Sequence, residues 1–183
     1  MTTMSIPKPD GYRDPGERER LIAAFRARPT LSVIAKLDLL LRLDRLNDPR
    51  VALFLLSVLS DPGEANQVRI DALKRLSDGP QAISNRQPLA EAILQILSQG
   101  ASLDLRLQAA LALAELTDVD GVLTTLGSLA LDPAETIDVR YAAFSSLEAA
   151  GPTPQCLAFL RQLAADETFG PSAKCLLSRW TLD

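Results

Sequence analysis

Histidine is absent from this chain of 183 residues, so it lacks the side chain that most often acts as general acid or base near neutral pH. Histidine-containing metal sites and the Ser–His or Cys–His pairs of nucleophilic enzymes are excluded with it. The chain has two cysteines, too few for a disulfide framework, and reduced thiols of a cytoplasmic protein are expected. These absences predict no enzymatic activity, no metal and no cofactor.

Positive charge and long apolar runs are also scarce. The formal net charge is −4, which disfavours binding to nucleic-acid backbones and to anionic membranes. The densest apolar run, from Val51 to Leu59, is about half of what a transmembrane helix needs. Glycine-rich phosphate loops are missing as well. We therefore expect neither a nucleic acid nor a membrane as partner.

What is present is a succession of helical patterns separated by proline and glycine. Residues 1–16 carry three prolines and two glycines without apolar periodicity, which predicts a flexible N-terminal arm. From residue 17 to residue 183 we expect a single repeat domain with apolar residues at the helical period. The expected helices are 17–28, 31–46, 49–60, 65–77, 88–99, 102–117, 119–131, 135–149, 154–165 and 171–181. Asp-Pro pairs at 48–49, 61–62 and 132–133 predict that each Asp caps the helix that follows it.

Three alternate helices repeat one motif, an apolar residue followed by Arg at +1, Ala at +4 and Leu at +8, and the first and last pairs carry degenerate copies without the Arg. The intact copies are Val68-Arg69, Ala72, Leu76; Leu105-Arg106, Ala109, Leu113; and Val139-Arg140, Ala143, Leu147. Positions 0, +4 and +8 fall on one helix face, and the small Ala allows a neighbouring helix to come close. One helix pair cannot bury such a face alone, so stacked pairs are expected.

The arginines of the motif, Arg69, Arg106 and Arg140, form a column at repeat spacing. Two functions fit such a column, a ladder that binds anions or a structural ladder between repeats. The second is favoured because Asp104 and Asp138 directly precede two of the motif copies.

On these three motif copies the chain resembles the HEAT-repeat family, particularly the short HEAT-like repeats named after phycobilisome lyases. The resemblance implies an all-α fold, a right-handed α-solenoid of five helix pairs whose second helices line the concave face. It also implies an interaction surface more often than an enzyme.

Two apolar features are candidate partner sites. A stripe through Ile70, Leu107, Leu111 and Tyr141 would lie on the concave face, as a groove for a partner helix or an extended peptide. Alternatively, these side chains pack against the adjacent inner helix. The predicted helix 31–46 is apolar nearly all round, including Leu39, Leu40 and Leu43. The apolar residues of this helix could be buried by a second copy in a homodimer, by another partner or by the N-terminal arm. Alternatively, the neighbouring helices bury them completely.

The sequence thus predicts a non-enzymatic scaffold or adaptor that binds a protein through the apolar concave groove. The alternative is a bilin-lyase-like enzyme, or a chaperone of a chromophore or other ligand, that uses the same face. A DNA-repair glycosylase built from such repeats would need a basic concave face, and the acidic balance of this chain disfavours it.

Overall fold

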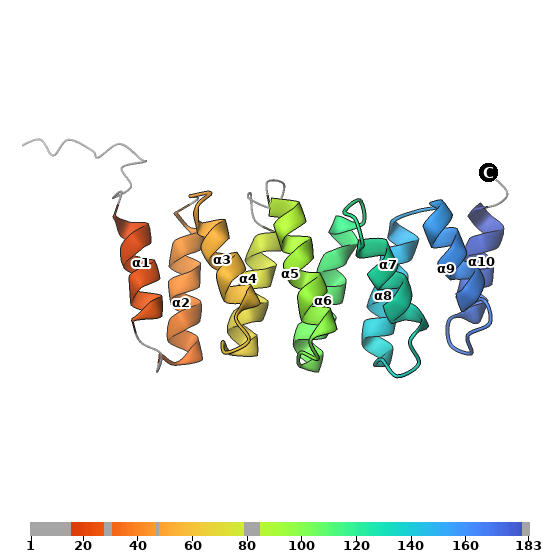
Figure 1. The fold of residues 1–183 in the computed structure, drawn as a ribbon, viewed down its shortest axis with the longest axis horizontal. Helices are drawn as coiled ribbons and strands as arrows, with labels where there is room; N and C mark the ends of the chain where they lie inside the picture. The colour runs from red at the N-terminus through yellow and green to blue at the C-terminus, as the bar shows by residue number, and fades with distance from the viewer. Residues whose placement is uncertain (1–15, 28–30, 47, 79–84, 181–183) are drawn as a thin grey trace, which may run out of the picture.

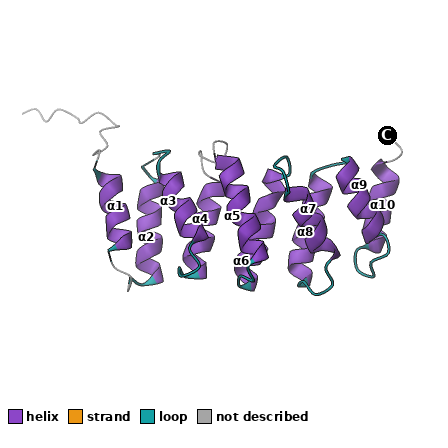
Figure 2. Ribbon diagram, viewed as in Figure 1, coloured by secondary structure: helices purple, strands orange, loops and turns teal. Residues whose placement is uncertain are grey.

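The chain forms ten α-helices in a computed structural model that describes residues 16–27, 31–46, 48–78 and 85–180. Among these residues no strand occurs, and Figure 2 shows helices joined by loops. The all-α prediction is therefore confirmed. The helices are α1 (Glu17–Arg26), α2 (Val33–Asp44), α3 (Val51–Ser60), α4 (Asn66–Asp78), α5 (Arg86–Ser98), α6 (Leu103–Ala112), α7 (Val122–Leu131), α8 (Ile137–Ala149), α9 (Pro154–Leu163) and α10 (Gly170–Trp180).

The helices stand side by side in an elongated array, with α1 at one end and α10 at the other (Figure 1). Successive helices pair as α1–α2, α3–α4, α5–α6, α7–α8 and α9–α10. Between pairs, odd-numbered helices α3, α5, α7 and α9 pack in sequence, and even-numbered helices α2, α4, α6 and α8 do the same. Two rows packed in this way are the arrangement of a HEAT-like α-solenoid.

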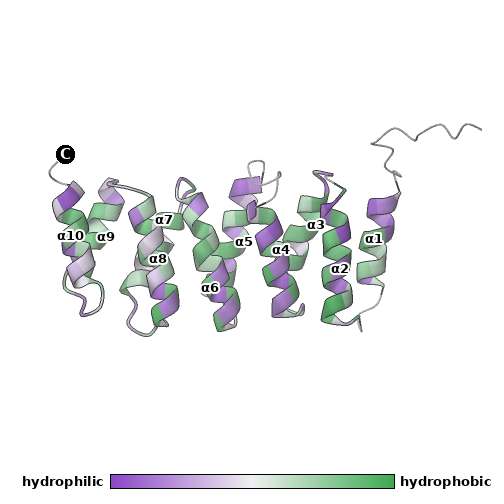
Figure 3. Ribbon diagram, turned by 180° about the vertical axis from the view of Figure 1, so that it is seen from behind, coloured by the Kyte–Doolittle hydropathy of each residue, from purple (hydrophilic) through white to green (hydrophobic). Residues whose placement is uncertain are grey.

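The repeat motif supplies the core between the two rows. All nine residues at motif positions 0, +4 and +8 in the three intact copies are buried. Each Ala at +4 is fully buried, as expected for a position where a neighbouring helix passes close by. Figure 3 shows both hydrophobic and hydrophilic residues on most of the helices. The apolar face of each helix is therefore used within the array.

All three Asp-Pro pairs differ from the prediction. Arg50, not Asp48, is the N-cap of α3, and the Asp48 carboxylate accepts from the Arg50 backbone N–H at 3.0 Å. Asp61 and Asp132 end α3 and α7 and do not start the next helix. Their carboxylates accept hydrogen bonds from backbone N–H groups two residues on, at Gly63 and Ala134, each 2.9 Å long. The next helices begin only at residues 66 and 137. The expectation of N-caps was wrong there, because Asp and Pro close a turn equally well.

Other expected features shift by small amounts or lie outside the described residues. The predicted helix 102–117 ends as an α-helix at Ala112 and continues as a 3₁₀ helix, η2 (Leu113–Leu116). Of the predicted N-terminal arm, residues 1–15 lie outside the described part of the chain. None of the helices described is long and apolar enough to cross a bilayer.

A close approach between α7 and α9 depends on a glycine. A Cβ at Gly127 would overlap the ring of Phe159 on α9. The missing side chain thus lets the odd-numbered row pack tightly at this point, although glycine inside a helix carries a conformational cost.

We expect Gly127→Ala to destabilise the protein. The gain in helix propensity is about 1 kcal/mol, whereas overpacking costs about 1–3 kcal/mol. Urea unfolding followed by circular dichroism should show a lower midpoint for the variant. Adding Phe159→Leu should restore it; if Gly127→Ala alone raises the midpoint, the close contact is not a constraint on the array.

Candidate functional site

The motif arginines reach back to the odd-numbered helix of their own pair. Arg69 Nε donates to the Leu59 carbonyl at 2.9 Å and Arg140 Nε to the Ala130 carbonyl at 3.0 Å. Arg106 Nη1 donates to the Leu97 carbonyl at 2.6 Å. Each carbonyl belongs to the next-to-last residue of α3, α7 or α5. A cation therefore satisfies carbonyls that the end of a helix leaves without an intrahelical partner.

Two of these arginines also reach forward to the next pair. Arg106 is hydrogen-bonded to Glu135 and Arg140 to Asp166, and both acids lie in the loop before the next even-numbered helix. Lys36 bridges α2 to the corresponding loop in the same way, with Nζ 2.6 Å from Glu64 Oε2. Arg106 and Arg140 thus link successive helix pairs, whereas Arg69 holds a carbonyl of its own pair.

The acids that bind these arginines are not the ones suggested by the sequence. Asp104 and Asp138 lie exposed in the first turns of α6 and α8. Each lies two positions before the arginine of its helix and is exposed, whereas the guanidinium reaches the loop of the next pair. Proximity in sequence therefore selected the wrong partners.

Arg69 differs from the other two arginines in having no acidic partner from the next pair among the described residues. The loop between α5 and α6, residues 99–102, contains no acid. Burial lowers the pKa of Arg69, and the charge of Asp61, in its own pair, acts in the opposite direction. Among the described residues, the second and third pairs therefore meet through the packing of α3 on α5 and of α4 on α6, without an ion pair.

Asp166 accepts hydrogen bonds through both of its carboxylate oxygens. Its Oδ1 accepts from the backbone N–H groups of Phe169, at 3.0 Å, and Thr168, at 2.8 Å. Its Oδ2 accepts from Arg140. The hydrogen bond from the Phe169 N–H, followed by that from Arg140, lowers the pKa of Asp166 below its ordinary value.

We expect Asp166→Asn to cost about 1 kcal/mol of stability at neutral pH, because a hydrogen bond to a charged group becomes a neutral one. Since the pKa is lower in the folded state, this contribution is complete above the ordinary value of 3.8 and is lost as the pH falls through the folded-state value. Unfolding curves of both proteins between pH 7 and pH 2 should converge in acid. A difference that does not change with pH would contradict the role of the carboxylate.

The predicted concave stripe lies on the even-numbered row but is only partly open. Leu111 is 48% exposed and Tyr141 is 55% exposed, whereas Ile70 and Leu107 are half-buried against the core. Tyr141 also packs edge-on against Phe169, with ring centroids 5.0 Å apart. Whether these four residues bind a partner stays a prediction.

Two residues of this surface were missed in the sequence analysis. Leu103 and Ile137 are each 47% exposed and lie one turn before Leu107 and Tyr141. The signal was available in the sequence, because the stripe continues four residues toward the start of both helices.

The leucines of α2 are not an accessible surface. Leu40 and Leu43 are fully buried and Leu39 is 9% exposed. Helix α2 packs against α1 and α4, which cover this face without a second copy or another partner. The expectation that these three leucines form a partner surface is therefore corrected. Its physical reason is that an inner helix of a solenoid has neighbours on three sides. A homodimer through residues 31–46 stays a prediction, since Ile34 of the same helix is 80% exposed.

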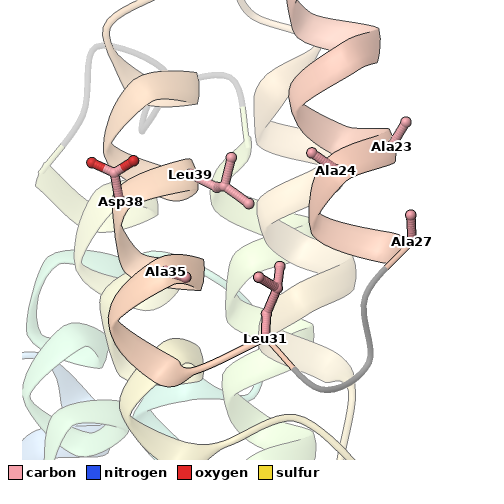
Figure 4. Close-up of a pocket in the computed structure, with 7 residues that line it drawn as sticks. All are labelled: Ala23, Ala24, Ala27, Leu31, Ala35, Asp38 and Leu39. Carbon is pink, nitrogen blue, oxygen red and sulfur yellow. The ribbon is translucent and has the colours of Figure 1, made fainter.

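A hollow of about 540 Å³ lies between α1 and α2, at the end of the array (Figure 4). Four alanines, two leucines and one charged residue, Asp38, line it. Leu39 is among these residues. The lining offers almost no polar group that could orient a ligand.

A second hollow of about 340 Å³ lies between α4 and α6, and it is chemically richer. Leu73, Leu111 and Ala112 give it an apolar side. The polar residues that line it are Lys74, Ser77, Asp78, Gln108 and Glu115. The Ser77 hydroxyl is buried and has no hydrogen-bond partner in the part of the chain that the structure describes. Buried polar atoms normally have partners, so this one marks the hollow as a candidate binding site.

No family model and no curated protein matches this chain. Among solved structures it is similar to that of human deoxyhypusine hydroxylase in complex with glycerol. The sequence identity is 18% and the TM-score 0.43, over 93% of this chain and 86% of the other. This likeness concerns the helical repeat fold alone.

The comparison corrects one expectation from the sequence. A hydroxylase is an enzyme, so the expectations of a non-enzymatic scaffold and of a chain without enzymatic activity were wrong as inferences from this fold. They had rested on eliminating the residue types of familiar catalytic sites, and the same repeat architecture occurs in enzymes.

Proposed function

We propose that this chain is a ligand-binding repeat protein of the phycobilisome-lyase type, which holds a linear tetrapyrrole in the hollow between α4 and α6. The unpartnered Ser77 hydroxyl in a hollow of mixed polarity is the observation that carries the proposal. The hollow lies on the even-numbered row, the face that the sequence assigns to ligand binding.

The polar lining complements the groups of a linear tetrapyrrole. Such a ligand carries propionate groups, pyrrole N–H donors and terminal carbonyls around a flat apolar body. Lys74 supplies a cation for a propionate, and the carboxylates of Asp78 and Glu115 can accept from pyrrole N–H groups. Ser77 and Gln108 offer donors for a carbonyl.

The apolar lining supports the body of the same ligand. Leu73 and Ala112 form the sides of the hollow on α4 and α6, and Leu111 adds a half-exposed side chain at its edge. An open hollow of this size takes one end of an elongated molecule, whose remainder would lie along the even-numbered row. A ligand held by one end keeps its other end available for transfer to an acceptor.

The test is a titration of the purified protein with biliverdin, followed by visible absorbance. We expect a saturable spectral shift in the wild type. Lys74→Ala should weaken binding about tenfold, since it removes one charge-assisted contact.

Lys174→Ala is the matched control, because Lys174 is an exposed lysine on α10, away from the hollow. It should bind biliverdin as the wild type does. No spectral shift in the wild type, or equal losses in both lysine variants, would contradict the proposal.

A further inference from the structure

A compact apolar patch lies over the first halves of α6 and α8. Its members are Leu103, Leu107, Ile137 and Tyr141, of which all but the half-buried Leu107 are about half exposed. Leu103 and Leu107 lie one turn apart on α6, as Ile137 and Tyr141 do on α8. Since α6 packs on α8 in successive repeats, equivalent positions stand next to each other across the two helices. We call these four residues the α6–α8 patch.

The exposed charged side chains of α6 and α8 are acidic. Asp104 and Asp138, both exposed, directly follow Leu103 and Ile137, and Glu167 is exposed in the loop before α10. The cations of α6 and α8 are Arg106 and Arg140, and both are held by backbone carbonyls and by Glu135 and Asp166. The patch therefore has an acidic border with no free cation on its own two helices.

We infer that the α6–α8 patch is a docking surface for a basic amphipathic helix of a partner protein. Such a helix presents apolar side chains at i and i+4, the spacing of Leu103 to Leu107 and of Ile137 to Tyr141. Lysine or arginine residues beside that apolar stripe would face Asp104 and Asp138, and the charge complementarity would orient the helix.

The same border disfavours other occupants. A second copy docked symmetrically would bring the acids of the two patches together, which costs free energy. An anionic lipid surface would be repelled as well. The α6–α8 patch shares no residue with the lining of the hollow between α4 and α6.

The probes are two fluorescent peptides of 15 residues with leucine at i, i+3, i+4 and i+7, one with lysine and one with glutamate at all other positions. We expect the leucine–lysine peptide to bind the wild type in fluorescence anisotropy, more weakly as salt rises, and the leucine–glutamate peptide not to bind.

Three variants locate the binding. The Leu107→Ser/Tyr141→Ser variant should weaken peptide binding more than about tenfold. The Asp104→Asn/Asp138→Asn variant changes only exposed side chains and should weaken peptide binding about fivefold at low salt. Leu53→Ser is the control for general apolar adhesion, because Leu53 is 67% exposed on α3 in the other row. It should bind as the wild type does.

Several results would overturn the inference. The first is that both peptides bind equally well, and the second is that the Asp104→Asn/Asp138→Asn variant binds the leucine–lysine peptide as the wild type does. The third is that Leu53→Ser weakens peptide binding as much as Leu107→Ser/Tyr141→Ser does. Binding of the protein to phosphatidylcholine vesicles that is lost in the Leu107→Ser/Tyr141→Ser variant would assign the patch to lipid instead.

Discussion

The array depends on basic side chains that tie one helix pair to the next. Arg106 and Arg140 each hold a carbonyl at the end of the preceding helix and an acid in the following loop. Lys36 and Glu64 make the corresponding bridge between the first two pairs. A solenoid has no contacts between distant repeats, so its curvature and register are set at each seam. Charged groups that are buried need such partners, and their geometry fixes how two pairs meet.

Much of this fold could be predicted from the sequence because the information is local. The positions of Val68, Ala72 and Leu76 in the motif specify a buried helix face, and the same spacing recurs in the other copies. The arginine at +1 was recognisable as a structural group. Its acidic partner was not, because Glu135 and Asp166 lie 29 and 26 residues away and outside the motif.

The candidate sites were less predictable, because exposure depends on how neighbouring pairs pack. Leu40 and Leu41 are adjacent in an apolar run, yet one is fully buried and the other 36% exposed. The hollow between α4 and α6 is formed by residues 30 or more positions apart, and no local pattern marks Ser77 as lacking a partner. The two surfaces on the even-numbered row now have separate chemistry, a polar hollow on α4 and α6 and an acidic-bordered apolar patch on α6 and α8.

The importance of the charged bridges is tested most directly by native-state hydrogen exchange in increasing urea. The described residues provide a bridge at every seam except the one that follows Arg69. We predict that helices α1 to α4 and helices α5 to α10 exchange as two cooperative units that separate at this seam. Exchange of the whole chain as one unit, or a boundary at the Arg106 or Arg140 seam, would contradict the account.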